Sequence, residues 1–146
     1  MNGISLDKKD RKIISVLKGD ARASIREISE TTGIRPSTVH KRIQKLVDTG
    51  VIENFTISLN DEKVGEGFTV HMLISGSTER YLDKKFLKSD HLKGVYGITG
   101  EYDMLLKMKF ESIGEFNDFL LKFREKHGQH LHRTLTMVQT ISLKDE

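Results

Sequence analysis

Apolar residues recur at helical spacing through the first fifty positions, and each apolar stretch stops at a glycine. The spacing predicts a first helix over residues 6–18, capped by Ser5 and ended by Gly19. Residues 24–27, Ser-Ile-Arg-Glu, are typical of a capping box, in which a hydroxyl and a carboxylate each accept a hydrogen bond from a backbone N–H group at the helix start. The second helix therefore begins there, runs to about residue 32 and stops at Gly33.

A proline opens the third apolar stretch. At the first position of a helix, proline has a suitable φ angle and lacks an N–H group that would otherwise stay unpaired, so Pro36 predicts a helix over residues 36–49, closed by Gly50. Four aliphatic residues share one face and are expected to pack against the other helices: Val39, Ile43, Leu46 and Val47. This arrangement of helices and short turns predicts a helix-turn-helix.

Residues 51–59 change to a period of two. Phe55, Ile57 and Leu59 alternate with polar residues, which predicts a half-buried strand that forms a wing or a bridge. The polar stretch 60–67 follows and contains two glycines. It predicts a boundary between a first domain, residues 1–60, and a second domain, residues 61–146.

The second half of the chain mixes strand and helix patterns. Glycine-containing turns and one further capping box, at residues 112–115, separate the elements. The predicted elements are a strand opening at Phe68, a helix over about residues 79–88, a strand over 95–99, a turn over 100–103, a strand over 104–110, a helix from residue 113 to about 123, and a strand over 130–143.

The order βαββαβ predicts a ferredoxin-like α+β domain, with two helices on one face of the sheet. The other face of the sheet is left without cover. A domain of about eighty residues buries a limited fraction of its surface, so a second subunit is the simplest cover for that face. We therefore expect a homodimer.

Composition narrows the classes of protein. The chain has no cysteine, which removes disulfide scaffolds, thiolate zinc sites and cysteine nucleophiles. It has no apolar run long enough to span a bilayer and no apolar stretch typical of a secretion signal at its start, so we expect a cytoplasmic protein without a membrane partner. Residues 1–60 carry 11 Lys and Arg against 7 Asp and Glu, whereas residues 61–146 carry 13 against 14. The basic excess lies in the predicted helix-turn-helix, as nucleic-acid binding requires.

The polar face of the third helix carries the candidate DNA-binding residues. Four cations and no acid lie between positions 35 and 45. We expect base-edge or nearby phosphate contacts from Ser37, Thr38 and His40, phosphate contacts from Lys41, Arg42 and Lys45, and either kind from Arg35. The alternative is an ordinary solvated helix face. RNA is disfavoured because Phe55 is the sole aromatic residue among the first sixty positions, and unstacked bases need aromatic platforms.

The sequence resembles the Lrp/AsnC, or feast/famine, family of prokaryotic transcriptional regulators over essentially its whole length. Residues 6–60 resemble the family's helix-turn-helix, residues 100–108 (GEYDMLLKM) its Gly-x-Tyr-Asp turn, and residues 133–143 (RTLTMVQTISL) its final strand. The resemblance implies dimers with face-to-face sheets, higher assemblies such as octamers, promoter DNA as a partner and amino acids as effectors. Arg35-Pro36 departs from the Ser-led start common in the family, which bears on base preference.

The resemblance also implies an effector site between dimers, around the turn and the last strand. The matching positions are Gly100, Glu101, Tyr102, Asp103, Thr134 and Thr136. Asp103 and Glu101 suit a ligand ammonium group, while threonine hydroxyls and backbone N–H groups suit a carboxylate. The alternative is that the turn residues only form a hairpin and that the threonines are ordinary strand formers.

Two other functions stay open at this point. An architectural protein that coats DNA without an effector would share every DNA-binding residue. A metabolic enzyme module is also compatible with a ferredoxin-like domain, and its best support is a possible metal site at His127, His130 and His132, for which no carboxylate has a matching spacing. The sequence has neither a phosphate loop nor a nucleophile elbow, so we expect no enzyme, no cofactor and no metal.

Overall fold

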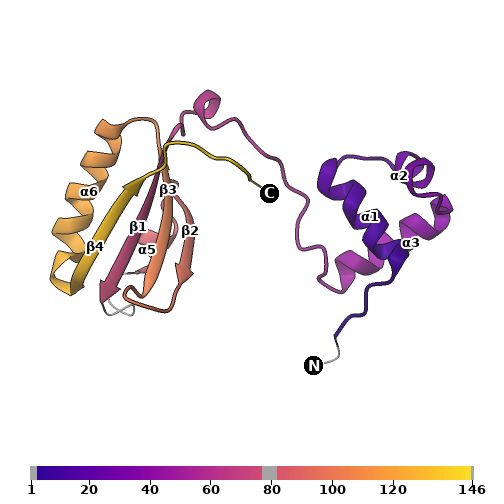
Figure 1. The fold of residues 1–146 in the computed structure, drawn as a ribbon, viewed down its shortest axis with the longest axis horizontal. Coiled ribbons are helices and arrows are strands. Elements are labelled where there is room, and N and C mark those ends of the chain that lie inside the picture. Colours follow the sequence, from indigo (N-terminus) through magenta and orange to yellow (C-terminus); the bar gives the residue numbers. More distant parts are fainter. Residues whose placement is uncertain (1–2, 77–81, 146) are drawn as a thin grey trace. The chain divides into compact units, whose positions relative to one another are not determined.

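The computed structural model describes residues 3–76 and 82–145 and divides into two compact units, Met1–Ser58 and Leu59–Glu146 (Figure 1). The first unit is helical, and the second is a sheet with helices. Among the described residues, no helix is both long enough and apolar enough to cross a membrane.

The first unit is a small bundle of α1 (Lys8–Gly19), α2 (Ile25–Thr32) and α3 (Pro36–Asp48). One aliphatic side chain from each helix, Ile13, Ile28 and Val39, meets Ile34 of the turn between α2 and α3 in its core. Full burial of such a side chain contributes about 1.5–3 kcal/mol, so this core fixes how the three helices pack. Val47 was expected to join the core but is 39% exposed, whereas its neighbour Leu46 in the same turn of α3 is buried.

Helix α1 starts two residues later than the sequence predicted. Its N-cap is Asp7, not Ser5: the Asp7 carboxylate accepts a hydrogen bond from the N–H of Asp10 at 2.9 Å, and the Asp10 carboxylate accepts one from the N–H of Asp7 at 3.1 Å. A hydroxyl or a carboxylate at a helix start can accept from a free N–H group. The carboxylate also carries a negative charge, which interacts favourably with the helix dipole.

The caps of the next two helices agree with the sequence. Ser24 and Glu27 form the predicted capping box, with hydrogen bonds of 3.1 and 2.7 Å, and Gly33 ends α2 with φ of 72°, in the left-handed region. Pro36 is the first residue of α3. These caps fix the short turn between α2 and α3.

The strand predicted over residues 51–59 is wrong. These residues belong to no helix or strand, and Ile57 is 74% exposed. Alternating residues favour an extended backbone, but a strand also needs a neighbouring strand for its hydrogen bonds, and the described part of this chain supplies none here.

The second unit confirms the predicted order βαββαβ. Its four-stranded antiparallel sheet has the order β2-β3-β1-β4. The elements are the 3-10 turn η1 (Glu62–Val64), β1 (Phe68–Gly76), α5 (Lys84–Leu87), β2 (Leu92–Gly97), β3 (Met104–Phe110), α6 (Ile113–His127), the 3-10 turn η2 (Gly128–His130) and β4 (Leu131–Val138).

One face of the sheet forms the core of the second unit. Its central strands present Val70, Met72 and Ile74 beside Met108, Leu106 and Met104, and these side chains are buried. Helix α6 covers them with a row of phenylalanines, of which Phe116 lies 5.3 Å from Phe110 between ring centroids. The core therefore joins the phenylalanines of α6 to Phe110 at the end of β3 and to the aliphatic and methionine side chains of the central strands.

The other face of the sheet carries apolar side chains at the surface. Leu73 pairs with Leu105 and with Leu135, so all three lie on this face, and Leu135 remains 43% exposed. Met137 and Tyr96 are exposed on the same face. We call the set Leu73, Tyr96, Leu105, Leu135 and Met137 the open sheet face.

Three element boundaries differ from the sequence prediction. The helix expected over 79–88 is a single turn, α5, with Asp83 as N-cap; residues 79–81 lie outside the described part of the chain. Strand β2 begins at Leu92 and ends at Gly97 instead of spanning 95–99. Strand β4 ends at Val138, opposite Val70, instead of residue 143. The N–H of Gln139 still donates to the carbonyl of Thr69 at 2.9 Å, but β1 begins at Phe68 and cannot pair with a strand that runs to residue 143; Leu143 is 90% exposed.

The capping box expected at residues 112–115 is half formed. Ser112 accepts a hydrogen bond from the N–H of Glu115 at 3.3 Å, as predicted. The Glu115 carboxylate, however, accepts one from the N–H of Glu111 at 2.6 Å and not from that of Ser112. The first turn of α6 is thus tied to the end of β3.

Candidate nucleic-acid interface

Helix α3 presents the expected polar face. Exposed side chains on or just before it are Arg35, Ser37, His40, Lys41 and Lys45, while Thr38 is half-buried. Val39 and Leu46 on the opposite side are buried. The aliphatic face therefore holds the helix against the bundle and leaves the polar face open.

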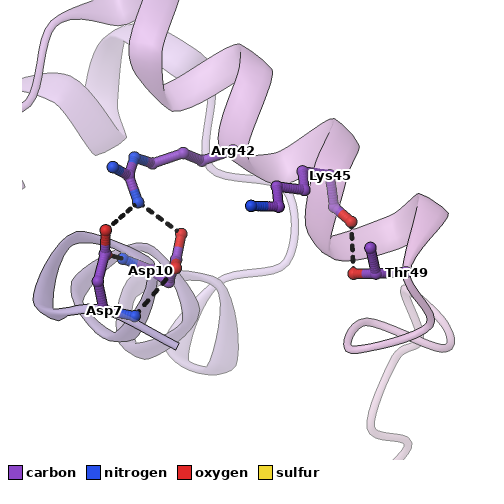
Figure 2. Close-up of polar contacts among 5 residues, drawn as sticks. All are labelled: Asp7, Asp10, Arg42, Lys45 and Thr49. Atoms are coloured by element: carbon purple, nitrogen blue, oxygen red, sulfur yellow. Dashed lines mark hydrogen bonds and ion pairs between the residues drawn. The ribbon is translucent and has the colours of Figure 1, made fainter. Parts of the chain in front are cut away.

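The cations of this face differ in their pairing. Within residues 3–76 and 82–145, the side chains of Arg35, Lys41 and Lys45 take part in no ion pair or hydrogen bond. Figure 2 shows that the contact of Lys45 is made by its backbone carbonyl, which accepts a hydrogen bond from the Thr49 hydroxyl at 2.6 Å. These three positive charges are available to an external anion.

Arg42 is placed differently from the expectation. Its Nη1 donates to Asp7 Oδ2 at 2.6 Å and to Asp10 Oδ1 at 2.9 Å, and the side chain is only 26% exposed (Figure 2). The N–H group of Asp10 and the Arg42 guanidinium together hold the pKa of Asp7 below its usual value. Arg42 is thus engaged by the start of α1 and is not a free phosphate anchor in this structure.

The N-terminus of α3 has no side-chain cap. Arg35 is the N-cap residue, and its side chain makes no capping hydrogen bond. Backbone N–H groups in the first turn of a helix point outward and, with the helix dipole, attract a phosphate. The start of α3 therefore adds a partial positive charge beside Ser37 and Thr38.

The turn between β2 and β3 holds the first group of expected effector residues. Asp103 ties the turn to the end of β1: its carboxylate accepts a hydrogen bond from the N–H of Gly76 at 2.8 Å, and its own N–H donates to the carbonyl of Ile74 at 2.9 Å. Gly100 has φ of 128°, which a residue with a Cβ adopts only with strain.

Arg133 is a residue of this region that the sequence analysis missed. It forms an ion pair with Glu101, its Nη2 donates a hydrogen bond to the Tyr102 hydroxyl at 3.2 Å, and its guanidinium carbon lies 5.2 Å from the centroid of the Tyr102 ring. The sequence offered one signal for it: Arg133 is a cation directly before Thr134, and the predicted turn contains the acidic residues Glu101 and Asp103. Both Glu101 and Tyr102 are therefore held by β4, which lies on the far side of β1 from the hairpin.

The two threonines lie on the other side of the sheet. Thr134 pairs with Ile74 and Thr136 with Met72, so both share the face that α6 covers. A cavity of about 180 Å³ opens there between α6 and β4, and Thr134 contributes to its wall. Within one chain, the structure thus separates the threonines from the Glu101–Arg133 pair.

The histidines considered for a metal site do not converge. His127 is buried at the end of α6, with its ring 5.7 Å from Phe86 and 5.1 Å from Phe123 between centroids. Burial, with the neighbouring charge of Lys126, lowers its pKa. Among the described residues, no three histidine or carboxylate groups meet in a geometry that could hold a metal ion.

Comparison with known protein families supports the assignment of the first unit. Residues 6–53 match the family model described as winged helix-turn-helix DNA-binding. The chain is also similar to the HTH-type transcriptional regulator FL11 of Pyrococcus abyssi, with 40% identity over 119 residues, covering 80% of this chain and 79% of that relative.

Solved structures match both units together. The transcriptional regulator NMB0573 of Neisseria meningitidis, in complex with L-Met, has 25% identity and a TM-score of 0.89, with 97% of this chain and 94% of that chain covered. LrpC of B. subtilis has 25% identity and a TM-score of 0.84, with 98% and 100% covered. The chain is therefore a DNA-binding transcriptional regulator that belongs to the Lrp/AsnC, or feast/famine, family.

Proposed function

We propose that residues 1–60 bind specific promoter sequences through α3, and that residues 61–146 pair subunits and bind an amino acid that modulates DNA binding. The observation that carries the first part is the polar face of α3, where exposed cations lack partners in the described residues. A regulator that binds promoters acts on the genome, so its proposed location is the cytoplasm. Relatives named as transcriptional regulators support a function other than catalysis.

The residues of α3 divide by chemistry. Ser37, Thr38 and His40 contact base edges or the nearest phosphate, because they are short or planar and stand near the helix start. Lys41 and Lys45 contact phosphates, and Arg35 does either. Phosphate contacts set orientation and affinity, while the polar residues near the helix start give sequence preference.

Salt-dependent binding tests the lysine assignment. Lys41→Ala and Lys45→Ala each lower affinity for all duplexes alike and reduce the slope of log affinity against log salt by about 0.9, the value for one phosphate contact. Lys122→Ala is the matched control, since Lys122 is an exposed lysine of α6 in the other unit. If both α3 variants keep the affinity and slope of the parent chain, α3 does not face the DNA backbone.

Effector binding around the β2–β3 turn and β4 is the second part of the proposal. The site lies between dimers, where groups that are separated within one chain can meet: Glu101 and Asp103 offer carboxylates to a ligand ammonium, while Thr134, Thr136 and the backbone of the turn offer partners to a ligand carboxylate. The Lrp/AsnC relationship and the L-Met complex of NMB0573 support this role. Gly100 and Tyr102 complete the set, with the glycine shaping the turn and the tyrosine held by Arg133.

Thermal shift measurements with each of the twenty amino acids test effector binding. A ligand present at one hundred times its dissociation constant stabilises the protein by about 2.7 kcal/mol, which raises the melting temperature by several degrees. Glu101→Gln removes the carboxylate expected to contact the ligand ammonium, so this variant shows a smaller shift in melting temperature with the same ligand. If no amino acid changes the melting temperature, the turn and the threonines have only structural roles.

The open sheet face supports a homodimer, from which a larger assembly such as an octamer is built. Leu135 and Met137 remain exposed on it, and pairing two such faces removes apolar surface from water. Leu135→Glu places a charge at the centre of this contact and therefore shifts the full-length chain towards monomer in sedimentation velocity. Leu121→Glu, at an exposed leucine on α6, is the matched control and leaves the assembly unchanged. A Leu135→Glu chain that sediments like the parent contradicts this interface.

A further inference from the structure

Arg42 connects α3 to the start of α1 through one nitrogen atom. Its Nη1 donates to both Asp7 and Asp10, at 2.6 and 2.9 Å (Figure 2). The two carboxylates lie 35 and 32 positions away in sequence, so this is a tertiary contact and not part of the helix that carries Arg42.

The two carboxylates are themselves fixed. Oδ1 of Asp7 accepts from the N–H of Asp10, and Oδ2 of Asp10 accepts from the N–H of Asp7, which leaves one oxygen of each for Arg42. Every oxygen of the pair thus has a partner. Hydrogen bonds to charged groups are directional, so this network, which we call the Asp7–Asp10–Arg42 clamp, holds α3 in one orientation against α1.

The clamp lies beside the lysines proposed to contact phosphates. Arg42 follows Lys41 directly and precedes Lys45 by three positions, which places Arg42 and Lys45 on adjoining turns of α3. Val39, Ile43 and Leu46 hold the aliphatic side of α3 against the bundle. This packing sets the position of the helix, and the clamp adds directional hydrogen bonds that resist rotation of α3 about its own axis.

We propose that Arg42 is a positioning residue: through Asp7 and Asp10 it fixes the rotation of α3 so that the side chains at the helix start meet base edges. This inference rests on the proposed DNA-binding role of α3. It assigns two acidic residues of α1 to sequence recognition, although neither is expected to touch DNA.

Substitution of Asp10 separates positioning from electrostatics. Asp10→Asn removes a negative charge near a polyanion and leaves Arg42 with the Asp7 carboxylate alone, so a purely electrostatic role for these residues predicts tighter binding and a steeper salt slope. Positioning predicts weaker binding to the preferred sequence, because the clamp is broken. The two explanations therefore predict opposite signs for the same variant.

The experiment uses the full chain and two duplexes, one selected from a random pool by the parent protein and one of unselected sequence. Fluorescence anisotropy over a range of salt gives affinity and slope for Arg42→Gln, Asp10→Asn and the double variant. We expect each to lower affinity for the selected duplex by about tenfold, with the unselected duplex and the salt slope little changed. The double variant loses no more than either single variant, because one network is broken only once.

Three controls keep the outcome interpretable. Glu53→Gln removes an exposed carboxylate of the same unit outside the clamp and leaves selectivity unchanged. Arg42→Lys retains the positive charge and is therefore expected to keep more of the selectivity than Arg42→Gln does. If Arg42→Gln loses helical circular dichroism, Arg42→Lys is measured in its place. Lys41→Ala reduces the salt slope on both duplexes; if it does not, the DNA-binding face of α3 is wrong, which is a separate failure.

Two results overturn the positioning role. One is an equal loss for Arg42→Gln on both duplexes with a slope reduced by about 0.9, which marks Arg42 as a phosphate contact. The other is tighter binding by Asp10→Asn with a steeper slope, which marks the two aspartates as simple repulsive charges.

Discussion

The core of the helical unit is small enough that one buried side chain accounts for a large share of its stability. Ile28 of α2 is completely buried and contacts the core residues of the other helices. Replacing it with alanine removes three carbon atoms and leaves a cavity, at a cost of about 2–5 kcal/mol. A unit of this length has a stability of roughly 3–9 kcal/mol, at about 0.05–0.15 kcal/mol per residue. Ile28→Ala therefore removes about half of the stability of the DNA-binding unit, and Ile28→Val removes about 0.5–1.5 kcal/mol.

The sequence provides a way to observe the two units separately. The chain has no tryptophan, and all three tyrosines lie after residue 59, so tyrosine fluorescence reports the second unit alone. Circular dichroism at 222 nm reports helices of both. In Ile28→Ala the dichroism develops an early transition in guanidinium chloride, DNA binding is lost over the same range, and the tyrosine transition stays at its original midpoint.

The matched control is Ile57→Ala, the same substitution at an exposed isoleucine of the same unit, and it changes stability by less than about 0.5 kcal/mol. If Ile28→Ala moves the dichroism and tyrosine midpoints together, the two units unfold as one. If it moves neither, the cavity argument for this core is wrong.

The remaining predictions concern pH and helix ends. Burial holds the pKa of His127 below its value in the unfolded chain. The stability that the neutral ring contributes is therefore present above about pH 6.5 and is lost as the pH falls through the folded-state pKa. The tyrosine-monitored unfolding midpoint decreases as the pH is lowered from 7.5 to 5.5, and His127→Leu reduces this pH dependence. Ser24→Ala removes the N-cap of α2 and lowers the dichroism-monitored stability by about 1 kcal/mol, while Ser15→Ala, at an exposed position inside α1, does not. Gly33→Ala forces a Cβ into the left-handed region and costs about 1 kcal/mol; an unchanged midpoint would mean that the turn relaxes.

Local signals in the sequence were sufficient for most helix ends and for the topology. Ser24, Gly33 and Pro36 each act through the backbone of their own helix or turn, so no distant residue is needed to interpret them. The order βαββαβ follows in the same way from changes of period between two and about 3.6. The exposed face of α3 was likewise readable, because its polar side is defined by the aliphatic side of the same helix.

Other features depend on residues far apart in the chain, and only the tertiary structure decided them. Residues 51–59 have the period of a strand, but no strand of the described residues pairs with them, and β4 ends at Val138 because β1, which begins at Phe68, cannot pair with a strand that runs to residue 143. Arg42 has the spacing of a phosphate contact, yet carboxylates more than thirty positions away hold it, as Glu101 holds Arg133. A sequence determines which groups an element presents, whereas a hydrogen bond or ion pair also requires a partner within about 3–4 Å, and that distance is set by packing.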